Sequence, residues 1–280
     1  MIGVYDSGFG GLTVLKRLRE RLPSRDFLYL GDSGRAPYGG RDVHTLLDFA
    51  EQCVERLFEE GCRLVIVACN TVSCVALRHL QRRYADPASP RRILGVTIPA
   101  AEAAVALSKG HIGVIATART VSSGTFVTEI QKLAPTIRVT QKAAPLLAPL
   151  VEEGWEDTEI GHLAVARYVA DLRDVDTLVL GCTHYPLLLA AFRAAFSGIL
   201  LDPAPYVAER LADWLLRHPG FDEPGSGALS ILCSGDPAIF REHGARFLGA
   251  PLPEVIHIAE ENGRLQRRLS VQILTGQILR

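Results

Sequence analysis

The sequence predicts an α/β fold built from two similar parallel-sheet units. Two observations support this prediction: short apolar runs alternate with amphipathic segments, and several of these runs recur later in the chain at a similar spacing. Fully apolar strands that alternate with helices are typical of parallel sheets covered by helices on both faces. With 280 residues, the chain can bury a substantial core as one large domain or two of medium size.

The apolar runs are predicted strands, and the segments between them are predicted helices. The helix after the first strand, LTVLKRLRERL (12–22), places its leucines on one stripe. In chain order, the predicted strands are IGVY (2–5), FLYL (27–30), LVIVA (64–68), IGVIA (112–116), IRVT (137–140), TLVLG (177–181), ILL (199–201) and SILC (230–233).

Three landmarks indicate an internal repeat. IGVYDSG at Ile2 recurs as IGVIATA at Ile112 (112 − 2 = 110), and FLYL at Phe27 is matched by IRVT at Ile137 (137 − 27 = 110). The cysteines of LVIVACNT and TLVLGCTH are 182 − 69 = 113 residues apart. We therefore expect one domain of residues 1–96 plus 208–280 and a second of residues 97–207, with SILC returning to complete the first.

Composition and charge exclude several classes of function. Lys and Arg total 30 against 31 Asp and Glu, so there is no basic excess for nucleic acid or an anionic membrane. The arginine-rich RLQRRL (264–269) is interpreted as a solvated helix face. No 18-residue apolar run predicts a membrane span, and MIGVYD already resembles a buried strand, so we expect a cytoplasmic, reduced protein.

Ligands of open parallel sheets bind beyond the carboxyl ends of the strands, so the residues there are candidate site residues. Polar and glycine-rich segments follow four of the predicted strands: YDSGFGG, LGDSGRAPYGG, VACNT and GCTHYP. Asp6 directly follows a predicted buried strand. Its carboxylate needs a hydrogen-bond donor or a function, because burying a carboxylate unpaired is costly.

Six cysteines are present, and their spacing favours neither disulfides nor a zinc site, since no C-x-x-C pair exists. We interpret Cys53, Cys62, Cys74 and Cys233 as packing residues. Cys69 and Cys182 each end an apolar strand just before a predicted helix start, a setting that lowers the pKa of a thiol.

Cys69 and Cys182 also occupy matching places in the two repeats. A symmetric pair suits a reaction with two faces, in which one thiolate removes a proton from a stereocentre and one thiol delivers a proton opposite. Nucleophilic acyl transfer by Cys182 with His184 is the alternative. It leaves Cys69 unexplained, and two residues so close in sequence need not face each other.

Taken together, these segments resemble the glutamate racemase family. The resemblance runs in order through YDSGFGGLTVLKRL, GDSGRAPYGGR, VIVACNTVSCVAL, GVTIPA, IGVIATARTVSSGTF, APLVEEG and LVLGCTHYPLL, and is loose after residue 220. It implies two flavodoxin-like domains related by pseudo-two-fold symmetry, with the active site in the cleft between them. It also implies a homodimer that needs no cofactor or metal and interconverts L- and D-glutamate to supply D-glutamate for peptidoglycan.

The resemblance assigns roles to individual residues. Cys182 is similar to the base for L-glutamate and Cys69 to the base for D-glutamate, with Asp6, His184 and Glu152 as assisting groups. The positions similar to substrate-binding residues are Asp6, Ser7, Tyr38, Gly39, Asn70, Thr71, Thr183 and His184. The alternatives are racemisation of another acidic amino acid such as aspartate, and a non-catalytic two-lobed protein that binds an amino acid.

Overall fold

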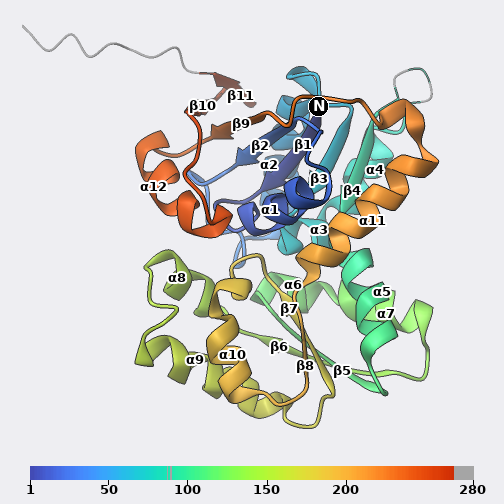
Figure 1. The fold of residues 1–280 in the computed structure, drawn as a ribbon, viewed down its shortest axis with the longest axis vertical. Coiled ribbons are helices and arrows are strands. Elements are labelled where there is room, and N and C mark those ends of the chain that lie inside the picture. The colour runs from blue at the N-terminus through green and yellow to red at the C-terminus, as the bar shows by residue number, and fades with distance from the viewer. Residues whose placement is uncertain (87, 89, 268–280) are drawn as a thin grey trace, which may run out of the picture.

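The computed structural model describes residues 1–86, 88 and 90–267, which form two α/β units, each built around its own sheet (Figure 1). The first sheet has the order β11-β10-β9-β2-β1-β3-β4. Its strands are β1 (Ile2–Asp6), β2 (Phe27–Gly31), β3 (Leu64–Val67), β4 (Arg92–Gly95), β9 (Leu229–Cys233), β10 (Val255–Glu261) and β11 (Arg264–Arg267).

The second sheet has the order β6-β5-β7-β8. Its strands are β5 (His111–Ala116), β6 (Arg138–Ala143), β7 (Thr177–Gly181) and β8 (Ile199–Leu201). All pairings in both sheets are parallel except that of β10 with β11. The α/β class predicted from the alternation of apolar runs and helices is confirmed.

The two sheets share one strand order, which explains the repeat in the sequence. The segment β2-β1-β3-β4 of the first sheet corresponds to β6-β5-β7-β8 of the second. Strands β3 and β7, which precede Cys69 and Cys182, therefore occupy equivalent central places. The strand predicted at residues 230–233 returns to the first sheet and pairs with β2. The proposed domain boundaries themselves remain predictions.

Helices cover both sheets, and α11 packs against both α1 and α5, so it connects the two units (Figure 1). The helices of the N-terminal part are α1 (Leu12–Arg21), α2 (Val43–Glu59), α3 (Asn70–Val75), α4 (Leu77–Arg83), α5 (Thr97–Leu107), α6 (Ala118–Ser123) and α7 (Thr125–Leu133). Those that follow are α8 (Leu147–Glu152), α9 (Glu159–Val169), α10 (Leu189–Ala195), α11 (Pro203–Arg217) and α12 (Pro237–Leu248).

Among the residues that the structure describes, no helix has the length and apolar character to cross a membrane.

All eight predicted strands are present, but β4, β10 and β11 were not predicted. The interpretation of RLQRRL as a helix face is wrong for its described part, because residues 264–267 form β11 and pair with β10. The connection between them is Asn262–Gly263, with φ values of 54° and 79°. Asn-Gly with both residues at positive φ is the preferred two-residue turn of a β-hairpin.

Candidate active site

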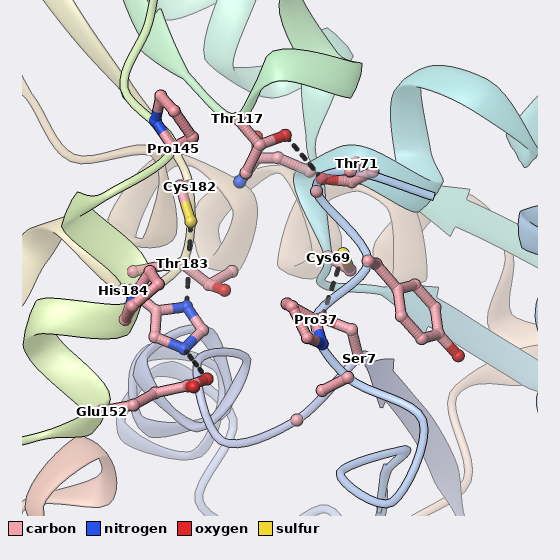
Figure 2. Close-up of a pocket in the computed structure, with 18 of the residues that line it drawn as sticks. Ser7, Pro37, Cys69, Thr71, Thr117, Pro145, Glu152, Cys182, Thr183 and His184 are labelled. Carbon is pink, nitrogen blue, oxygen red and sulfur yellow. Dashed lines mark hydrogen bonds and ion pairs between the residues drawn. The ribbon is translucent and has the colours of Figure 1, made fainter. Parts of the chain in front are cut away.

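The carboxyl ends of both sheets face a cavity of about 250 Å³. Its walls come from the loops after β1, β2 and β3 of the first sheet and from those after β5, β6 and β7 of the second. Every predicted site residue except Asp6 lines it, namely Ser7, Tyr38, Gly39, Cys69, Asn70, Thr71, Glu152, Cys182, Thr183 and His184. Figure 2 shows Cys182, His184 and Glu152 on one side of this cavity and Cys69 with Ser7 on the other.

On the Cys182 side, three residues form a connected chain (Figure 2). Cys182 Sγ lies 3.8 Å from His184 Nδ1, and His184 Nε2 lies 2.9 Å from Glu152 Oε1. The sequence spacing left open whether Cys182 and His184 face each other, and the structure shows that they do, because a tight turn after β7 brings both side chains to one wall. Tyr185 N–H donates to the Cys182 carbonyl in this turn.

The two partners of His184 favour its charged form. Burial alone disfavours an imidazolium, but the hydrogen bonds to Cys182 and Glu152 outweigh burial and raise the pKa of His184 to about 10. At neutral pH the ring is therefore a cation, 3.8 Å from Cys182 Sγ. A cation at this distance stabilises negative charge on the sulfur.

On the opposite side, Cys69 is in a different electrostatic setting. The residue has 5% relative exposure, and its thiol lies 3.6 Å from the Ser7 hydroxyl. Burial and the nearby Asp6 raise the pKa of Cys69 to about 12, although the Val72 N–H and the Ser7 hydroxyl oppose them. The predicted lowering of the pKa at this helix start is therefore wrong for Cys69, because desolvation of the thiolate is the larger effect.

The two cysteines are thus unlike each other in this structure. Cys69 is held as a neutral thiol at physiological pH, whereas Cys182 has an imidazolium beside it. Thiols on two walls of one cavity are groups that can remove a proton from a bound molecule on one side and deliver a proton on the other.

Asp6 lies behind the cavity wall and is fully buried. Its carboxylate accepts hydrogen bonds from the Gly8 N–H at 3.0 Å and from the Thr183 hydroxyl at 3.3 Å. Burial raises the pKa of Asp6, and the charged His184 nearby acts in the opposite direction. Asp6 therefore connects the first unit to the turn that carries Cys182, and its predicted contact with a substrate stays a prediction.

Tyr38 lines the cavity, and its hydroxyl belongs to a buried polar cluster. The hydroxyl donates to Asp32 and accepts from the Tyr5 hydroxyl at 3.1 Å. Asp32 is fully buried and also pairs with Arg35 at 2.8 Å. This cluster fixes the loop that presents Tyr38 and Gly39 to the cavity.

A row of hydroxyl groups lies at the boundary of the two units. Thr71 Oγ1 lies 2.9 Å from Thr117 Oγ1 and 3.3 Å from Thr120 Oγ1. Thr117 was not predicted from the sequence, although it follows β5 directly. Residues after the carboxyl ends of strands are candidate site residues elsewhere in the chain, and the same criterion identifies Thr117. Pro145, on the loop after β6, is a second cavity residue that was not predicted.

Asn70 provides an unpaired acceptor in this wall. Its side-chain oxygen Oδ1 is buried and has no hydrogen-bond partner among the described residues. A buried carbonyl oxygen without a donor costs free energy. Within the described part of the chain, no group of three or more His, Cys, Asp or Glu residues could hold a metal ion.

Fold and site together define an α/β enzyme whose two candidate proton-transfer groups come from equivalent strands of two sheets. A family model described as Asp/Glu/Hydantoin racemase matches residues 13–211. Glutamate racemase from Geobacter metallireducens is 39% identical over 267 residues, which are 93% of this chain and 97% of that protein. Glutamate racemase from Syntrophus aciditrophicus is 40% identical over 260 residues, covering 91% of this chain and 94% of that protein.

Solved structures are similar over the same extent. Glutamate racemase from Francisella tularensis, in complex with D-glutamate, has a TM-score of 0.85 and 30% identity, covering 92% of this chain and 97% of that one. Glutamate racemase from Thermus thermophilus, in complex with β-chloro-D-alanine, has a TM-score of 0.82 and 38% identity, covering 92% and 96%. The chain belongs to the Asp/Glu/Hydantoin racemase family, and as a racemase it is an enzyme of the isomerase class.

Proposed function

We propose that this enzyme interconverts L- and D-glutamate without a cofactor, acts in the cytoplasm and supplies D-glutamate for peptidoglycan. The observation that carries the proposal is the pair Cys69 and Cys182, which follow equivalent strands and line one cavity. The relatives named glutamate racemase, matched over most of their length, support glutamate as the substrate. So does the solved relative in complex with D-glutamate.

In the proposed reaction, the Cys182 thiolate takes the α-proton of L-glutamate and becomes a thiol. The electron pair of the broken C–H bond stays on the α-carbon, and the Cys69 thiol delivers its proton to the opposite face. D-glutamate leaves with Cys69 as a thiolate, and the reverse reaction exchanges the two roles. The imidazolium of His184 favours the starting arrangement because it stabilises the Cys182 thiolate.

The cavity wall supplies polar groups suited to an amino acid with two carboxylates. Hydroxyls of Ser7, Thr71 and Thr117 are donors for carboxylate oxygens. Preorganised donors in a site with little water stabilise the developing charge on the α-carbon and its carboxylate. We propose that these donors stabilise the charge on the α-carbon that an electron-withdrawing cofactor stabilises in other enzymes.

The substrate assignment is tested with purified enzyme and either enantiomer of glutamate or aspartate. We expect each glutamate enantiomer to reach an equal mixture, measured by chiral chromatography, and aspartate to react at least about tenfold more slowly. Activity should persist in hydroxylamine, which traps carbonyl cofactors. Faster turnover of aspartate would instead support the alternative of racemisation at another acidic amino acid.

The pH dependence of kcat/KM should follow the ionisation of His184. Its pKa is raised, so the imidazolium is present below about pH 10 and is lost as the pH rises through that value. We expect kcat/KM to fall on the alkaline side near pH 10, before the Cys69 thiol ionises near 12. A decline centred near pH 7 would contradict the charged state assigned to His184.

A thiol acyltransferase or hydrolase is the second candidate, because the chain from Cys182 through His184 to Glu152 is also typical of nucleophilic catalysis. It gives Cys69 no role. Incubation with p-nitrophenyl esters of N-acylglutamate, followed by mass spectrometry, would detect a covalent acyl group on Cys182. We expect none to accumulate, and an acyl-enzyme formed at a catalytic rate would favour this candidate.

We also propose that the enzyme is a homodimer. Ile160 and Leu163 expose 54% and 61% of their surface and lie three residues apart, on one face of α9. Large apolar side chains that gather on a surface are typical of protein interfaces. Light scattering should give twice the 30.4 kDa of a single chain, and a monomer at micromolar concentration would contradict the proposal.

A further inference from the structure

Two neighbouring side chains of α12 reach the region of His184 from the first unit. The Phe247 ring meets the His184 imidazole edge-on, with centroids 5.2 Å apart and an interplanar angle of 80°. Arg246 Nη2 donates to the backbone carbonyl of Val151 and forms an ion pair with Glu156 Oε1 at 3.1 Å. Helix α12 of the first unit thus contacts the His184 imidazole. It also contacts the segment of the second unit that carries Glu152, the hydrogen-bond partner of His184.

The segment from Val151 to Glu156 is shaped to receive the Arg246 guanidinium. Val151 is in the last turn of α8, where the helix dipole favours a cation, and its carbonyl accepts from the Gly154 N–H at 3.1 Å as well as from Arg246. Gly154 has a φ of 76°, and a Cβ built on it would lie 3.1 Å from Arg246 Nη1. In this ion pair the Glu156 side chain has 15% exposure and the Arg246 side chain 37%.

We propose that Arg246 is a positioning residue for the reaction, which holds the α8 terminus so that Glu152 stays hydrogen-bonded to His184. Glu152 directly follows Val151, so a shift of the backbone carbonyl moves the carboxylate as well. The present separation of Glu152 Oε1 from His184 Nε2 is 2.9 Å, and a shift of about 1 Å takes the pair beyond hydrogen-bond range. The inference rests on the proposed racemisation, and Arg246 itself does not line the cavity.

Loss of the Glu152 contact changes the ionisation of His184. The titratable groups facing the imidazole are Cys182, Glu152 and Asp6. If Glu152 moves away, one of the groups that favour the imidazolium is lost, so the His184 pKa falls. The alkaline decline of kcat/KM then moves to lower pH. Because the equilibrium constant between enantiomers is one, kcat/KM must fall by the same factor in both directions.

The test compares Arg246→Ala with Arg246→Lys and with Arg241→Ala, a change at an exposed residue of the same helix. We expect Arg246→Ala to lower kcat about tenfold with little change in KM, and to move the alkaline decline down by about one pH unit. Arg246→Lys should recover most of the activity, and Arg241→Ala should match the parent enzyme. Thermal unfolding of each variant reports whether the fold is intact.

A second readout does not depend on activity. NMR titration of the ¹³C-labelled His184 ring, assigned by its loss in His184→Gln, should give a lower pKa in Arg246→Ala than in the parent. Parent-like kcat and His184 titration in a folded Arg246→Ala variant would overturn the inference, as would lost activity with a parent-like titration. Absence of racemisation by the parent enzyme would instead contradict the proposed function, while the titration still tests the contact.

Discussion

Replacing Cys69 or Cys182 by alanine is expected to lower kcat/KM for glutamate racemisation by about 10²–10⁴-fold, the usual contribution of a general acid or base. Each variant retains one thiol, so the substrate still binds but lacks a proton donor or acceptor on one face. Cys74→Ala is the matched control, because Cys74 lies on the same short helix as the residues after Cys69 but does not line the cavity. Its activity should remain within about twofold of the parent.

The measurement is racemisation of both enantiomers by all three variants, with circular dichroism to confirm folding. A folded Cys69→Ala or Cys182→Ala variant with a tenth or more of parental kcat/KM would contradict the assignment of two bases. An equal loss of kcat/KM in Cys74→Ala would show that removing a thiol disturbs the fold and does not act on proton transfer.

Gly10→Ala is expected to have the next largest effect. A Cβ at this position would lie 2.6 Å from His184 Nδ1 and would also contact the Thr183 hydroxyl. Such an approach forces the turn after β7 away from the first unit. Displacement of catalytic groups by about 1 Å can cost about 10²-fold in rate, and overpacking costs about 1–3 kcal/mol of stability. We therefore expect kcat to fall at least about 10²-fold and the midpoint of thermal unfolding to fall.

Gly220→Ala provides the control for the general effect of replacing a glycine. No heavy atom lies within 4 Å of a Cβ built at Gly220, far from the cavity residues in sequence. Its activity and unfolding temperature should match those of the parent. Near-parental turnover by Gly10→Ala would show that the glycine turn and the turn after β7 are not in close contact during the reaction.

The sequence predicted the fold well because the strands of a buried parallel sheet are continuous apolar runs. The recurrence of these runs also identified equivalent places in the two sheets, as the shared strand order confirms. Strand β4 was missed because RILG (92–95) begins with an arginine and is only partly buried. The hairpin of β10 and β11 was missed although Asn262–Gly263 is a strong turn signal, because the strand sequences VIHIAEE and RLQR are not continuous apolar runs.

The site was predictable as a set of residues but not as an electrostatic arrangement. Strand-end positions and the family resemblance identified most of the cavity wall, including both cysteines. Sequence spacing could not show that His184 turns toward Cys182, or that burial outweighs the helix start at Cys69. The contribution of Arg246 depends on α12 crossing to the other unit, a contact between residues 95 positions apart.

In the proposed reaction, two thiols on opposite faces of the substrate transfer two different protons. Racemisation of protiated L-glutamate in deuterated water tests it directly, with mass spectrometry of both enantiomers during the first few per cent of conversion. The two-base account predicts that newly formed D-glutamate carries deuterium at Cα, supplied by the solvent-exchanged Cys69 thiol, while the remaining L-glutamate is still protiated. D-glutamate that keeps the original protium would contradict it, because one base would then have returned the same proton.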